Sequence, residues 1–560
     1  MAATAPRPLG DLIRHLEARG MLRTLLAAPG VSSALPEVRG IGFDSRVVTA
    51  GDVFLAVPGG LVDGHDYAAQ AVARGAVAVI AERALPRLGV PQLLVVAARP
   101  ALALAAAWFH DFPSYQLGVV GVTGTDGKTT TAHLVRSMLA ESGLPAGMIS
   151  TVDVVVGGES LGDTGHTTPD AVFVQAELAG MLEAGDRFAV VESTSHGLAL
   201  DRVAEVAFDV GVLTNITHEH LDLHGTHEAY RRAKRRLFEW LAVGPHNPDK
   251  GWPKSAVINR EDRWADEFIA AAEQSGARVL TYAADARTQA DVHATAVQEA
   301  AAELTISVQT ARWQAPVSLA LIGHFNVYNA LAAIGVGEAL DLDPEQMRRG
   351  LAAAGPVGGR MQRIDQGQDF AVFVDFAHTP AALAAALDAL APLAAAGGGG
   401  LIAVFGSAGA RDTEKRPMMG RAAGERSRLV VLTEDDPRAE DVNQIMDEIA
   451  RGAEEAGHRR DHDLLLIADR ESAIRRAMDL ARAGDVVLLA GKGHERTLAR
   501  AEGPVAWNET AVARAALAAL GYGAAADGEA AADGATKGDG TTDGTTDGTT
   551  EGGGEAGNGW

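Results

Sequence analysis

The chain of 560 residues contains no cysteine. This absence excludes disulfide bonds, thiolate metal sites, iron–sulfur clusters and a cysteine nucleophile. Any bound metal ion must therefore be held by oxygen atoms of carboxylate, hydroxyl or phosphate groups or by imidazole nitrogen atoms.

Positive charge is also scarce, because 49 Lys and Arg residues stand against 73 Asp and Glu, which gives a formal net charge of −24. Such an acidic surface argues against binding to the phosphate backbone of nucleic acids and to anionic membranes. We therefore expect no nucleic acid among the partners of this protein.

Long hydrophobic runs are missing too. The first twenty residues carry charged side chains throughout, and no stretch among them has the apolar core of a signal peptide. The most apolar segments, Ala101–Phe109 and Ala381–Ala396, are short or interrupted by Asp388 and Pro392. A membrane span needs about 18 uninterrupted apolar residues, so we predict no membrane span and a cytoplasmic location.

The remaining pattern alternates short apolar strands with alanine-rich helices, which is typical of α/β domains with parallel sheets. We predict an N-terminal domain over residues 1–113, a central P-loop parallel-sheet ATPase domain over 114–354 and a Rossmann-like C-terminal domain over 355–522. The segment 523–560 is rich in Gly, Asp and Thr and cannot form a core, so it is predicted to be a disordered acidic tail. A calcium-binding repeat in this tail is less favoured, because hydrophobic positions between its acidic residues are missing.

Each predicted strand is a short run of mostly apolar residues. They are Val53–Val57, Ala76–Ile80, Leu93–Val96, Leu117–Thr123, Phe188–Glu192, Val210–Thr214, Ala371–Asp375, Leu401–Phe405, Leu429–Thr433 and Asp485–Ala490.

A glycine-rich turn follows the strand that ends at Thr123, and a helical run over Ala132–Ala140 comes after it. This order of elements suits a nucleotide triphosphate, because backbone N–H groups and the helix N-terminus would face the phosphates. Lys128 would offset their charge, and Thr129 would offer a hydroxyl to Mg²⁺. The full P-loop pattern is not met, because Val122 occupies its first glycine position, and an ordinary turn remains the alternative. The predicted phosphate-binding residues are Gly124, Thr125, Asp126, Gly127, Lys128, Thr129 and Thr130.

Two further strands end in groups that favour metal binding. Glu192 closes one strand at the sheet edge where parallel sheets present their ligands, and a carboxylate there suits Mg²⁺. The next strand runs into a segment that contains His218, Glu219, His220, Asp222 and His224. Three histidines could equally indicate zinc, but the His-Glu-x-x-His spacing of zinc proteases is absent. A glutamate that caps a helix, or one that is merely exposed, remains the alternative for Glu192.

Together these motifs resemble those of the Mur ligases, and among them the MurE branch. The resemblance rests on Gly-Thr-Asp-Gly-Lys-Thr-Thr from Gly124, on Glu-Ser-Thr-Ser-His-Gly-Leu from Glu192 and on the segment Asn215–Gly225, and it extends over about residues 25–518. It implies an ATP-dependent ligase of peptidoglycan biosynthesis. Such an enzyme would form an acyl phosphate on the D-Glu carboxylate of UDP-MurNAc-L-Ala-D-Glu, and the amine of a diamino acid would then displace the phosphate.

The same resemblance assigns catalytic and metal-binding roles. It implies that Thr129 binds a first Mg²⁺ and that Glu192 and His220 bind a second, with Lys128 acting on the phosphates. Lys234 matches the lysine that this family carbamylates with CO₂, which would turn a cation into an anion able to face Mg²⁺. Taken without the resemblance, Lys234 lies among four arginines and reads as part of a basic helix face.

Substrate-binding residues also follow from the resemblance. The UDP-substrate is expected at Ser45, Arg46, His65, Thr167, Thr168, Ser195 and Arg202, and further ATP contacts are expected at Asn329, Arg360, Asp375 and His378. His166 belongs to the segment expected to hold the muramoyl group, and Lys415 to a loop expected to close over the site. Leu200 stands where MurE enzymes often have Gln, and a leucine side chain cannot make the polar contact to the substrate that a Gln would make.

The diamino acid is expected at Arg411, Asp435, Asp436, Arg438, Gly491 and Glu495. Enzymes of this branch that add meso-diaminopimelate resemble Asp-Asn-Pro-Arg here, whereas this chain has Asp436 in place of Asn. The pairing of Arg438 with a distal carboxylate is worth about 1.5–3 kcal/mol, and the screened repulsion from Asp436 about 1 kcal/mol or less. Diaminopimelate is therefore favoured, while L-lysine and L-ornithine stay open.

Two rival functions remain compatible with the sequence. One is a sibling amide ligase of the folylpolyglutamate or cyanophycin type, which the Asp44–Arg46 and His166–Pro169 segments disfavour. The other is a binding protein that holds a nucleotide or UDP-muropeptide without catalysis, which the set Lys128, Glu192, His220 and Lys234 disfavours. We expect a monomer that needs ATP and Mg²⁺.

Overall fold

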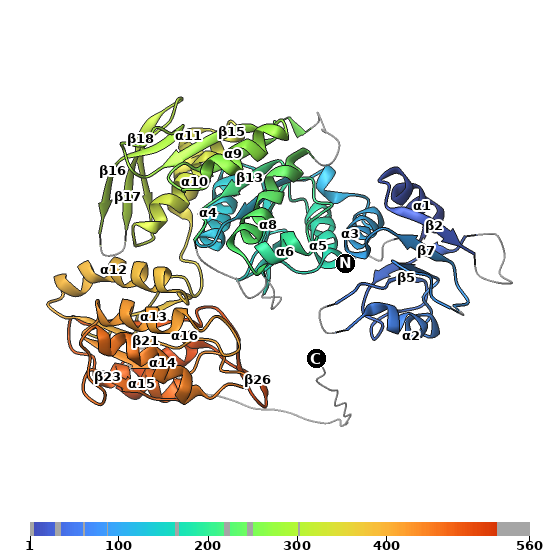
Figure 1. Cartoon of the computed structure of the whole chain (residues 1–560). Coiled ribbons are helices and arrows are strands. Elements are labelled where there is room, and N and C mark those ends of the chain that lie inside the picture. Colours follow the sequence, from blue (N-terminus) through green and yellow to red (C-terminus); the bar gives the residue numbers. More distant parts are fainter. Residues whose placement is uncertain are drawn as a thin grey trace, which may run out of the picture.

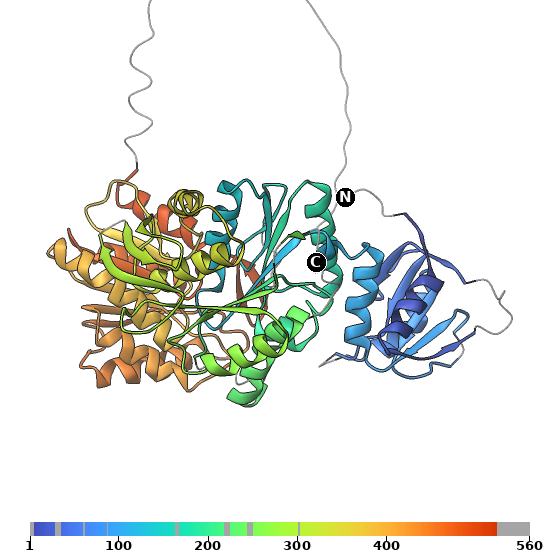
Figure 2. The same ribbon diagram turned by 90° about the horizontal axis from the view of Figure 1, so that it is seen from above.

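The structure is a computed structural model that describes residues 5–27, 35–59, 62–86, 88–162, 167–217, 224–242, 250–251, 253–300 and 303–523. Figure 1 shows three units built around separate sheets, with the N-terminal unit (blue) at one end of the central unit and the C-terminal unit (orange) below it. Seen from above in Figure 2, the N-terminal unit lies on the far side of the central unit from the C-terminal one. The tail that was predicted to be disordered, residues 523–560, lies outside the described residues except for Gly523.

The N-terminal unit holds a five-stranded sheet in the order β2-β7-β6-β5-β4, parallel except for the antiparallel edge strand β2. Helices α1 and α3 cover one face and α2 the other. Its elements are β1 (Arg7–Pro8), α1 (Leu9–Ala18), β2 (Leu22–Leu26), β3 (Glu37–Val38), β4 (Gly40–Gly42), β5 (Asp52–Leu55), η1 (Gly64–Tyr67), α2 (Ala68–Ala73), β6 (Ala78–Ala81), β7 (Gln92–Val95) and α3 (Ala98–Phe109).

The central unit holds an eleven-stranded sheet in the order β11-β10-β9-β12-β8-β13-β14-β15-β16-β17-β18. Its elements are η2 (Pro113–Tyr115), β8 (Gly118–Thr123), α4 (Lys128–Glu141), β9 (Ala146–Ile149), β10 (Val154–Val156), β11 (Glu159–Gly162), α5 (Ala171–Glu183), β12 (Phe188–Glu192), α6 (Ser195–Ala199), β13 (Val210–Leu213), α8 (His227–Glu239), η3 (Trp240–Ala242), β14 (Ser255–Asn259), α9 (Ala265–Gln274), β15 (Arg278–Ala283), β16 (Val292–Glu299), β17 (Leu304–Gln309), β18 (Gln314–Leu319), α10 (Phe325–Ala339) and α11 (Pro344–Ala353).

The neighbouring strands β9-β12-β8-β13-β14-β15-β16 of this sheet run parallel to one another, and both faces of that part are buried. Helices α4, α10 and α11 pack on one face, while α5, α8 and α9 pack on the other. Strands such as β8 are therefore buried at every position and carry a run of mostly apolar residues instead of an alternating pattern, as expected for a doubly covered parallel sheet. The carboxyl ends of β8, β12 and β13 meet at one edge, because their registers align.

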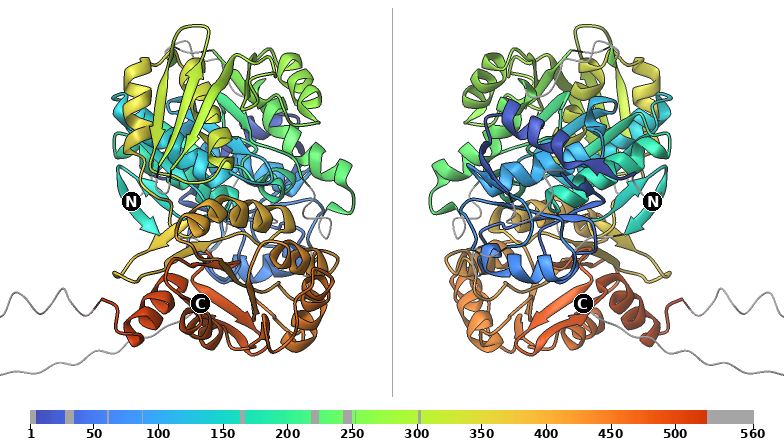
Figure 3. Two further views of the ribbon diagram at one scale, coloured as in Figure 1. Left: turned by 90° about the vertical axis from the view of Figure 1, so that its left-hand side faces the viewer. Right: turned by 90° about the vertical axis from the view of Figure 1, so that its right-hand side faces the viewer.

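The C-terminal unit holds a six-stranded sheet in the order β19-β20-β24-β21-β22-β23, with only β19 antiparallel. Figure 3 shows α12 at the boundary with the central unit. The elements are β19 (Gln362–Ile364), β20 (Ala371–Asp375), α12 (Pro380–Ala396), β21 (Leu401–Phe405), α13 (Lys415–Gly424), β22 (Leu429–Leu432), α14 (Val442–Glu455), β23 (Leu464–Leu466), α15 (Arg470–Asp479), β24 (Val486–Ala490), β25 (Thr497–Arg500), β26 (Gly503–Ala506) and α16 (Glu509–Ala519).

These elements confirm the predicted α/β class and the predicted strands, which the structure reproduces to within two residues at each end. The antiparallel strands β10 and β11 at one edge, and β17 and β18 at the other, were not predicted. Strands β11, β17 and β18 mix polar and apolar residues, so they lack the continuous apolar runs on which the prediction relied, and β10 is an apolar run of only three residues. The domain boundaries at 113, 354 and 522 stay predictions.

Among the described residues, no helix combines the length and the apolar character that a bilayer crossing requires.

Candidate active site

The predicted phosphate loop lies between β8 and α4, as expected. Gly124 and Gly127 both have positive φ angles, +147° and +84°. A Cβ atom on Gly127 would lie 2.3 Å from Oδ1 of Asn329, and one on Gly124 would lie 1.8 Å from Oγ1 of Thr214. Glycine is therefore required at both positions, because neither the backbone conformation nor the space admits a side chain.

The loop is held from the neighbouring strand β13. Thr214 donates its hydroxyl to the carbonyl oxygen of Asp126 at 2.6 Å, and the Asn215 side-chain amide donates to the same oxygen at 3.1 Å. The backbone N–H of Asp126 donates to Oδ1 of Asn215 at 3.0 Å. Asn215 thus fixes the middle of the loop on both its donor and its acceptor side.

Two side chains of the loop differ in what they contact. Lys128 donates to the carbonyl oxygen of Thr125 at 2.7 Å, so its ammonium lies against its own loop. Thr129 donates its hydroxyl toward Glu192, with Oγ1 at 3.1 Å from both carboxylate oxygens. Lys128, Thr129 and Glu192 line one cavity together with Thr151.

Glu192 ends strand β12, and only 1% of its surface is exposed. Besides the Thr129 hydroxyl it accepts the backbone N–H and the hydroxyl of Thr151, each at 3.0 Å. A buried carboxylate beside a threonine hydroxyl at a phosphate loop is an oxygen donor set that fits Mg²⁺.

Lys234 reaches the same loop from helix α8. Its side chain is buried, and Nζ donates to the carbonyl oxygen of Gly124 at 2.6 Å. Nζ also lies 4.7 Å from the ring centroid of Tyr230, whose hydroxyl is 2.9 Å from Oγ1 of Thr125. The structure therefore turns Lys234 inward, away from the exposed basic face that was its alternative interpretation.

The predicted ligand His220 lies outside the described residues, as do His218, Glu219, Asp222 and His166. Of the described histidines nearby, His196 and His224 have ring centroids 5.8 Å apart. The role of His220 stays a prediction.

A second cavity, of about 420 Å³, lies between the central and C-terminal units. It brings together predicted nucleotide-binding residues that are far apart in the chain. They are Asp126, Gly127, Thr130, Asn329, Arg360, Asp375 and His378. Apolar side chains from α12 and Phe325 form much of the rest of the wall, which suits a flat aromatic base.

Arg360 connects the C-terminal unit to the phosphate loop, whereas Asp375 accepts hydrogen bonds from within the C-terminal unit. Arg360 donates from Nη2 to Oγ1 of Thr129 at 3.3 Å, and its Cζ lies 4.6 Å from the ring centroid of Phe376. Asp375 accepts the backbone N–H groups of Met361 at 2.7 Å and Ala377 at 2.8 Å. Burial raises the pKa of Asp375 more than the Arg360 charge lowers it.

Part of the predicted UDP-substrate set lies close to Glu192. Thr168 donates its hydroxyl to the Glu192 carbonyl oxygen at 2.8 Å, and Arg202 donates to the Thr168 carbonyl oxygen at 2.7 Å. Thr167 lines the cavity of Glu192, and the buried hydroxyl of Ser195 has no hydrogen-bond partner within the described part of the chain. Arg202 and Leu200 line a further cavity that also borders Phe43 and Arg99 of the N-terminal unit.

The structure does not bring Ser45, Arg46 or His65 to that cavity. Ser45 donates to Oε1 of Gln70 at 2.9 Å, and the exposed Arg46 pairs with Asp44. Both ring nitrogens of His65 are engaged within the N-terminal unit, Nδ1 with Asp63 at 2.6 Å and Nε2 with the backbone N–H of Glu82 at 3.0 Å. Uridine binding by these three residues stays a prediction.

The six residues predicted for the diamino acid all line one cavity, which we call the amino-acid cavity. They are Arg411, Asp435, Asp436, Arg438, Gly491 and Glu495, and Thr167, His378 and Lys415 line it as well. Lys415 donates to the carbonyl oxygen of His378 at 2.9 Å, but it is the first residue of helix α13 and not part of a loop as predicted. Thr167 and His378 border both this cavity and the one that contains Glu192.

Sequence reasoning missed several residues that shape the site. Thr151 follows β9 and reaches Glu192 from another strand, so no spacing in the sequence links the two. Tyr230 and Asn215 lie in or beside the quoted motifs, yet only the folded chain shows that they hold Thr125 and Asp126. Lys492 contacts two residues of the amino-acid cavity wall, and its position in the sequence does not indicate this.

Known proteins match this chain over most of its length. Residues 37–110 match the Mur ligase family catalytic domain, residues 122–337 the Mur ligase middle domain and residues 359–493 the Mur ligase glutamate ligase domain. The UDP-N-acetylmuramyl-tripeptide synthetase of Roseiflexus sp. is 47% identical over 87% of this chain and 96% of its own length. The UDP-N-acetylmuramoyl-L-alanyl-D-glutamate–2,6-diaminopimelate ligase of Geobacillus kaustophilus is 38% identical over 86% of this chain and 95% of its own length.

Solved structures of Mur ligases also resemble this chain. A UDP-N-acetylmuramoyl-L-alanyl-D-glutamate–2,6-diaminopimelate ligase superposes with a TM-score of 0.60 and 31% identity, covering 87% of this chain and 96% of that one. MurF from Acinetobacter baumannii superposes with a TM-score of 0.62 at 21% identity, covering 88% of this chain and 96% of that one, which shows a shared fold alone.

Proposed function

Since this chain belongs to the Mur ligase family, we propose that it adds a diamino acid to the D-Glu carboxylate of UDP-MurNAc-L-Ala-D-Glu. The chain is an ATP-dependent amide ligase of peptidoglycan biosynthesis. The observation that carries the proposal is the continuity of two cavities. Thr167 and His378 border both the cavity of the phosphate loop and Glu192 and the amino-acid cavity.

The first half of the reaction would activate the carboxylate. A carboxylate oxygen of the D-Glu residue attacks the γ-phosphorus of ATP, ADP leaves, and an acyl phosphate remains. Lys128 is placed to offset charge on the phosphates once its ammonium leaves the carbonyl oxygen of Thr125. Arg360 touches the same loop from the C-terminal unit, so nucleotide binding and closure of the units would support each other.

Magnesium fits the oxygen donors found here. Thr129 would hold a first ion, and Glu192, His220 and a carbamate on Lys234 would hold a second. When bound, Mg²⁺ offsets charge on the transferred phosphoryl group. The inward position of Lys234 beside the Gly124 carbonyl oxygen supports the carbamate, because a carbamate there would bring negative charge to the metal-binding edge of the loop.

The second half would form the amide bond. The amine of the diamino acid attacks the acyl carbon, phosphate leaves, and the amine loses a proton. An amino acid in the amino-acid cavity would approach past Thr167 and His378. Holding the two reactants in adjoining cavities supplies proximity, and closure limits hydrolysis of the acyl phosphate by water.

Among diamino acids, the charges of the amino-acid cavity favour meso-diaminopimelate. Its two carboxylates need two cationic partners, and Arg411 and Arg438 line the cavity. Asp436 was expected to repel the distal carboxylate, but Lys492 lies 2.8 Å from its Oδ1 and offsets its charge. L-lysine and L-ornithine, which lack the distal carboxylate, are the alternatives. We also propose that the enzyme acts in the cytoplasm as a monomer.

Phosphate release tests the function directly. The full chain is incubated with ATP, Mg²⁺ and UDP-MurNAc-L-Ala-D-Glu, and with meso-diaminopimelate, L-lysine or L-ornithine in separate reactions. We expect phosphate release that requires both the UDP-dipeptide and the amino acid, and that is fastest with diaminopimelate. Release with a folate or with an aspartate-containing peptide instead would support a sibling ligase. Binding of ATP without any amine-dependent release would support a non-catalytic protein.

A further inference from the structure

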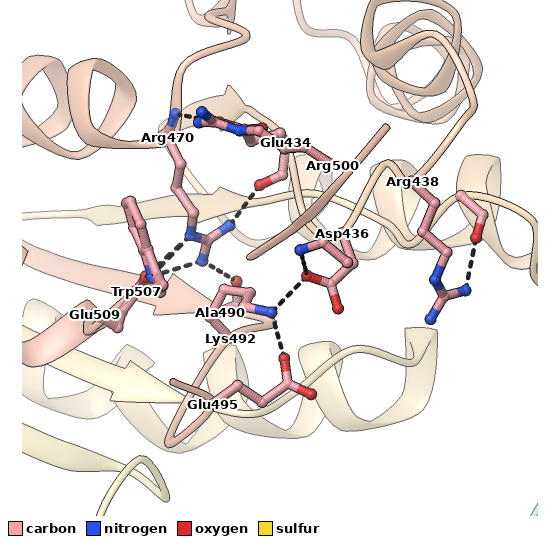
Figure 4. A network of polar contacts seen from close by, with 12 residues as sticks. Glu434, Asp436, Arg438, Arg470, Ala490, Lys492, Glu495, Arg500, Trp507 and Glu509 are labelled. Carbon is pink, nitrogen blue, oxygen red and sulfur yellow. Dashed lines mark hydrogen bonds and ion pairs between the residues drawn. The ribbon is translucent and has the colours of Figure 1, made fainter. Parts of the chain in front are cut away.

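A buried lysine lies against the wall of the amino-acid cavity. Lys492 follows strand β24, and none of its side-chain surface is exposed. Its Nζ lies 2.8 Å from Oδ1 of Asp436 and 2.5 Å from Oε2 of Glu495. Figure 4 draws both contacts as dashed lines. Both acids line the cavity, whereas Lys492 contributes nothing to the cavity surface. One ammonium group thus serves two carboxylates of the wall from inside the protein.

Lys492 also belongs to the set of contacts that holds the turn between Asp436 and Arg438. These two residues have positive φ angles of +48° and +54°, which side chains larger than hydrogen disfavour. The backbone N–H of Ala499 donates to Oδ1 of Asp436 at 2.8 Å, and the N–H of Arg438 donates to the Ala499 carbonyl oxygen at 2.9 Å. Arg438 then donates from Nη1 to the Gly409 carbonyl oxygen at 2.9 Å.

The charge balance of the wall depends on the same lysine. Carboxylate oxygens of Asp435, Asp436 and Glu495 lie within 4.8 Å of one another. Three such groups carry a formal charge of −3, and the ammonium of Lys492 reduces it to −2. Burial lowers the pKa of Lys492, but the nearby carboxylates raise it more, so the group keeps its proton.

We propose that Lys492 is a positioning residue that sets the amino-acid preference of this enzyme. It neutralises Asp436 and holds the turn that carries Arg438, so that the cavity accepts a diamino acid with a distal carboxylate. The inference rests on the proposed function and identifies the residue behind the cavity wall on which substrate choice depends. An amino acid without a distal carboxylate depends on it less, because Asp436 then has no like charge to repel.

The test compares Lys492→Met, Asp436→Asn and the double variant in the full chain, by phosphate release with meso-diaminopimelate and with L-lysine. We expect Lys492→Met to raise the KM for diaminopimelate by about tenfold or more and the KM for L-lysine by less than about threefold. The KM for ATP should stay within about twofold. Asp436→Asn in the same chain should restore most of the lost preference for diaminopimelate, because it removes the charge that Lys492 had offset.

A matched control removes a buried lysine–aspartate pair elsewhere. Lys254 lies 3.0 Å from Oδ1 of Asp209 in the central unit. Lys254→Met should lower the melting temperature without changing the ratio of the two KM values. If Lys492→Met alone does not fold, the double variant and Asp436→Asn carry the test, and they should show the same preference.

Three outcomes overturn the inference. They are an equal rise in both KM values, a double variant that prefers diaminopimelate no more than Lys492→Met does, and a wild type that uses only L-lysine or L-ornithine. A wild type that releases no phosphate with any diamino acid overturns the proposed function instead, whatever the variants do.

Discussion

The hydroxyl oxygen of Thr129 lies 3.1 Å from each carboxylate oxygen of Glu192. The two residues are 63 positions apart in the chain, one at the start of α4 and the other at the end of β12. Their contact joins the phosphate loop to the neighbouring parallel strand at the edge where ligands bind in such sheets.

We predict that Glu192→Gln slows phosphate release by about 100-fold, because an amide is a much poorer Mg²⁺ ligand than a carboxylate. The Mg²⁺ concentration for half-maximal rate should rise, and a magnesium titration of the initial rate measures it. Glu177→Gln is the control, since Glu177 is a buried acid of helix α5 away from the loop. An unchanged magnesium dependence in Glu192→Gln would show that Glu192 is not a ligand.

We predict that Gly127→Ala raises the KM for ATP by about tenfold or more. The new Cβ would meet Oδ1 of Asn329 at 2.3 Å, in addition to the strain of a positive φ. Gly143→Ala is the control. It introduces only the strain of a positive φ, +72°, because no atom lies within 4 Å of the new Cβ position. That variant should lose thermal stability while its KM for ATP stays within about twofold. Equal KM values in the two variants would contradict the role of the Gly127–Asn329 contact.

We predict that Lys234→Met lowers the turnover number by about 100-fold, because it removes the group proposed to carry the carbamate. The wild type should lose activity in buffer free of CO₂ and regain it when bicarbonate is added. Arg232→Met removes an exposed cation from the same helix and should leave activity unchanged. A wild-type rate independent of bicarbonate, together with no carbamate signal in ¹³C spectra, would refute the modification.

We predict a pH-dependent stabilisation by the pair of Arg416 and Glu440 in the C-terminal unit. Arg416 is fully buried and donates to Glu440 at 2.6 and 2.9 Å, which lowers the pKa of Glu440 from 4.5 to about 2. Because the folded state binds this proton less tightly than the unfolded state, the stabilisation is complete above about pH 4.5 and is lost as the pH falls toward 2.

Melting temperatures measured from pH 7 down to pH 2 check this. Glu440→Gln should melt well below the wild type at pH 7, and the difference should shrink between pH 4.5 and pH 2. Glu471→Gln breaks an exposed pair with Arg475 and should shift the melting temperature little at any pH. A difference for Glu440→Gln that does not change with pH would contradict the assignment.

Much of the fold followed from local patterns. Strands β8, β12, β20 and β21 were predicted because both of their faces are largely buried, so each is a run of mostly apolar residues. The edge strands β11 and β18 were missed because their exposed faces admit polar residues, so their pattern resembles that of loops. For the site, the amino-acid cavity unites all six predicted residues, whereas Ser45, Arg46 and His65 lie apart from the cavity of Arg202.

The sequence by itself determined the chemistry that this protein can carry. Without cysteine, its ligands are oxygen and nitrogen atoms, and the run from Gly124 to Thr130 between a strand and a helix is suited to phosphates. Only the tertiary structure decided which groups meet. It placed Thr151 on Glu192, turned Lys234 inward to Gly124 and set Lys492 against Asp436. These contacts join separate elements, so they depend on how sheets and helices pack, which residue spacing along the chain does not record.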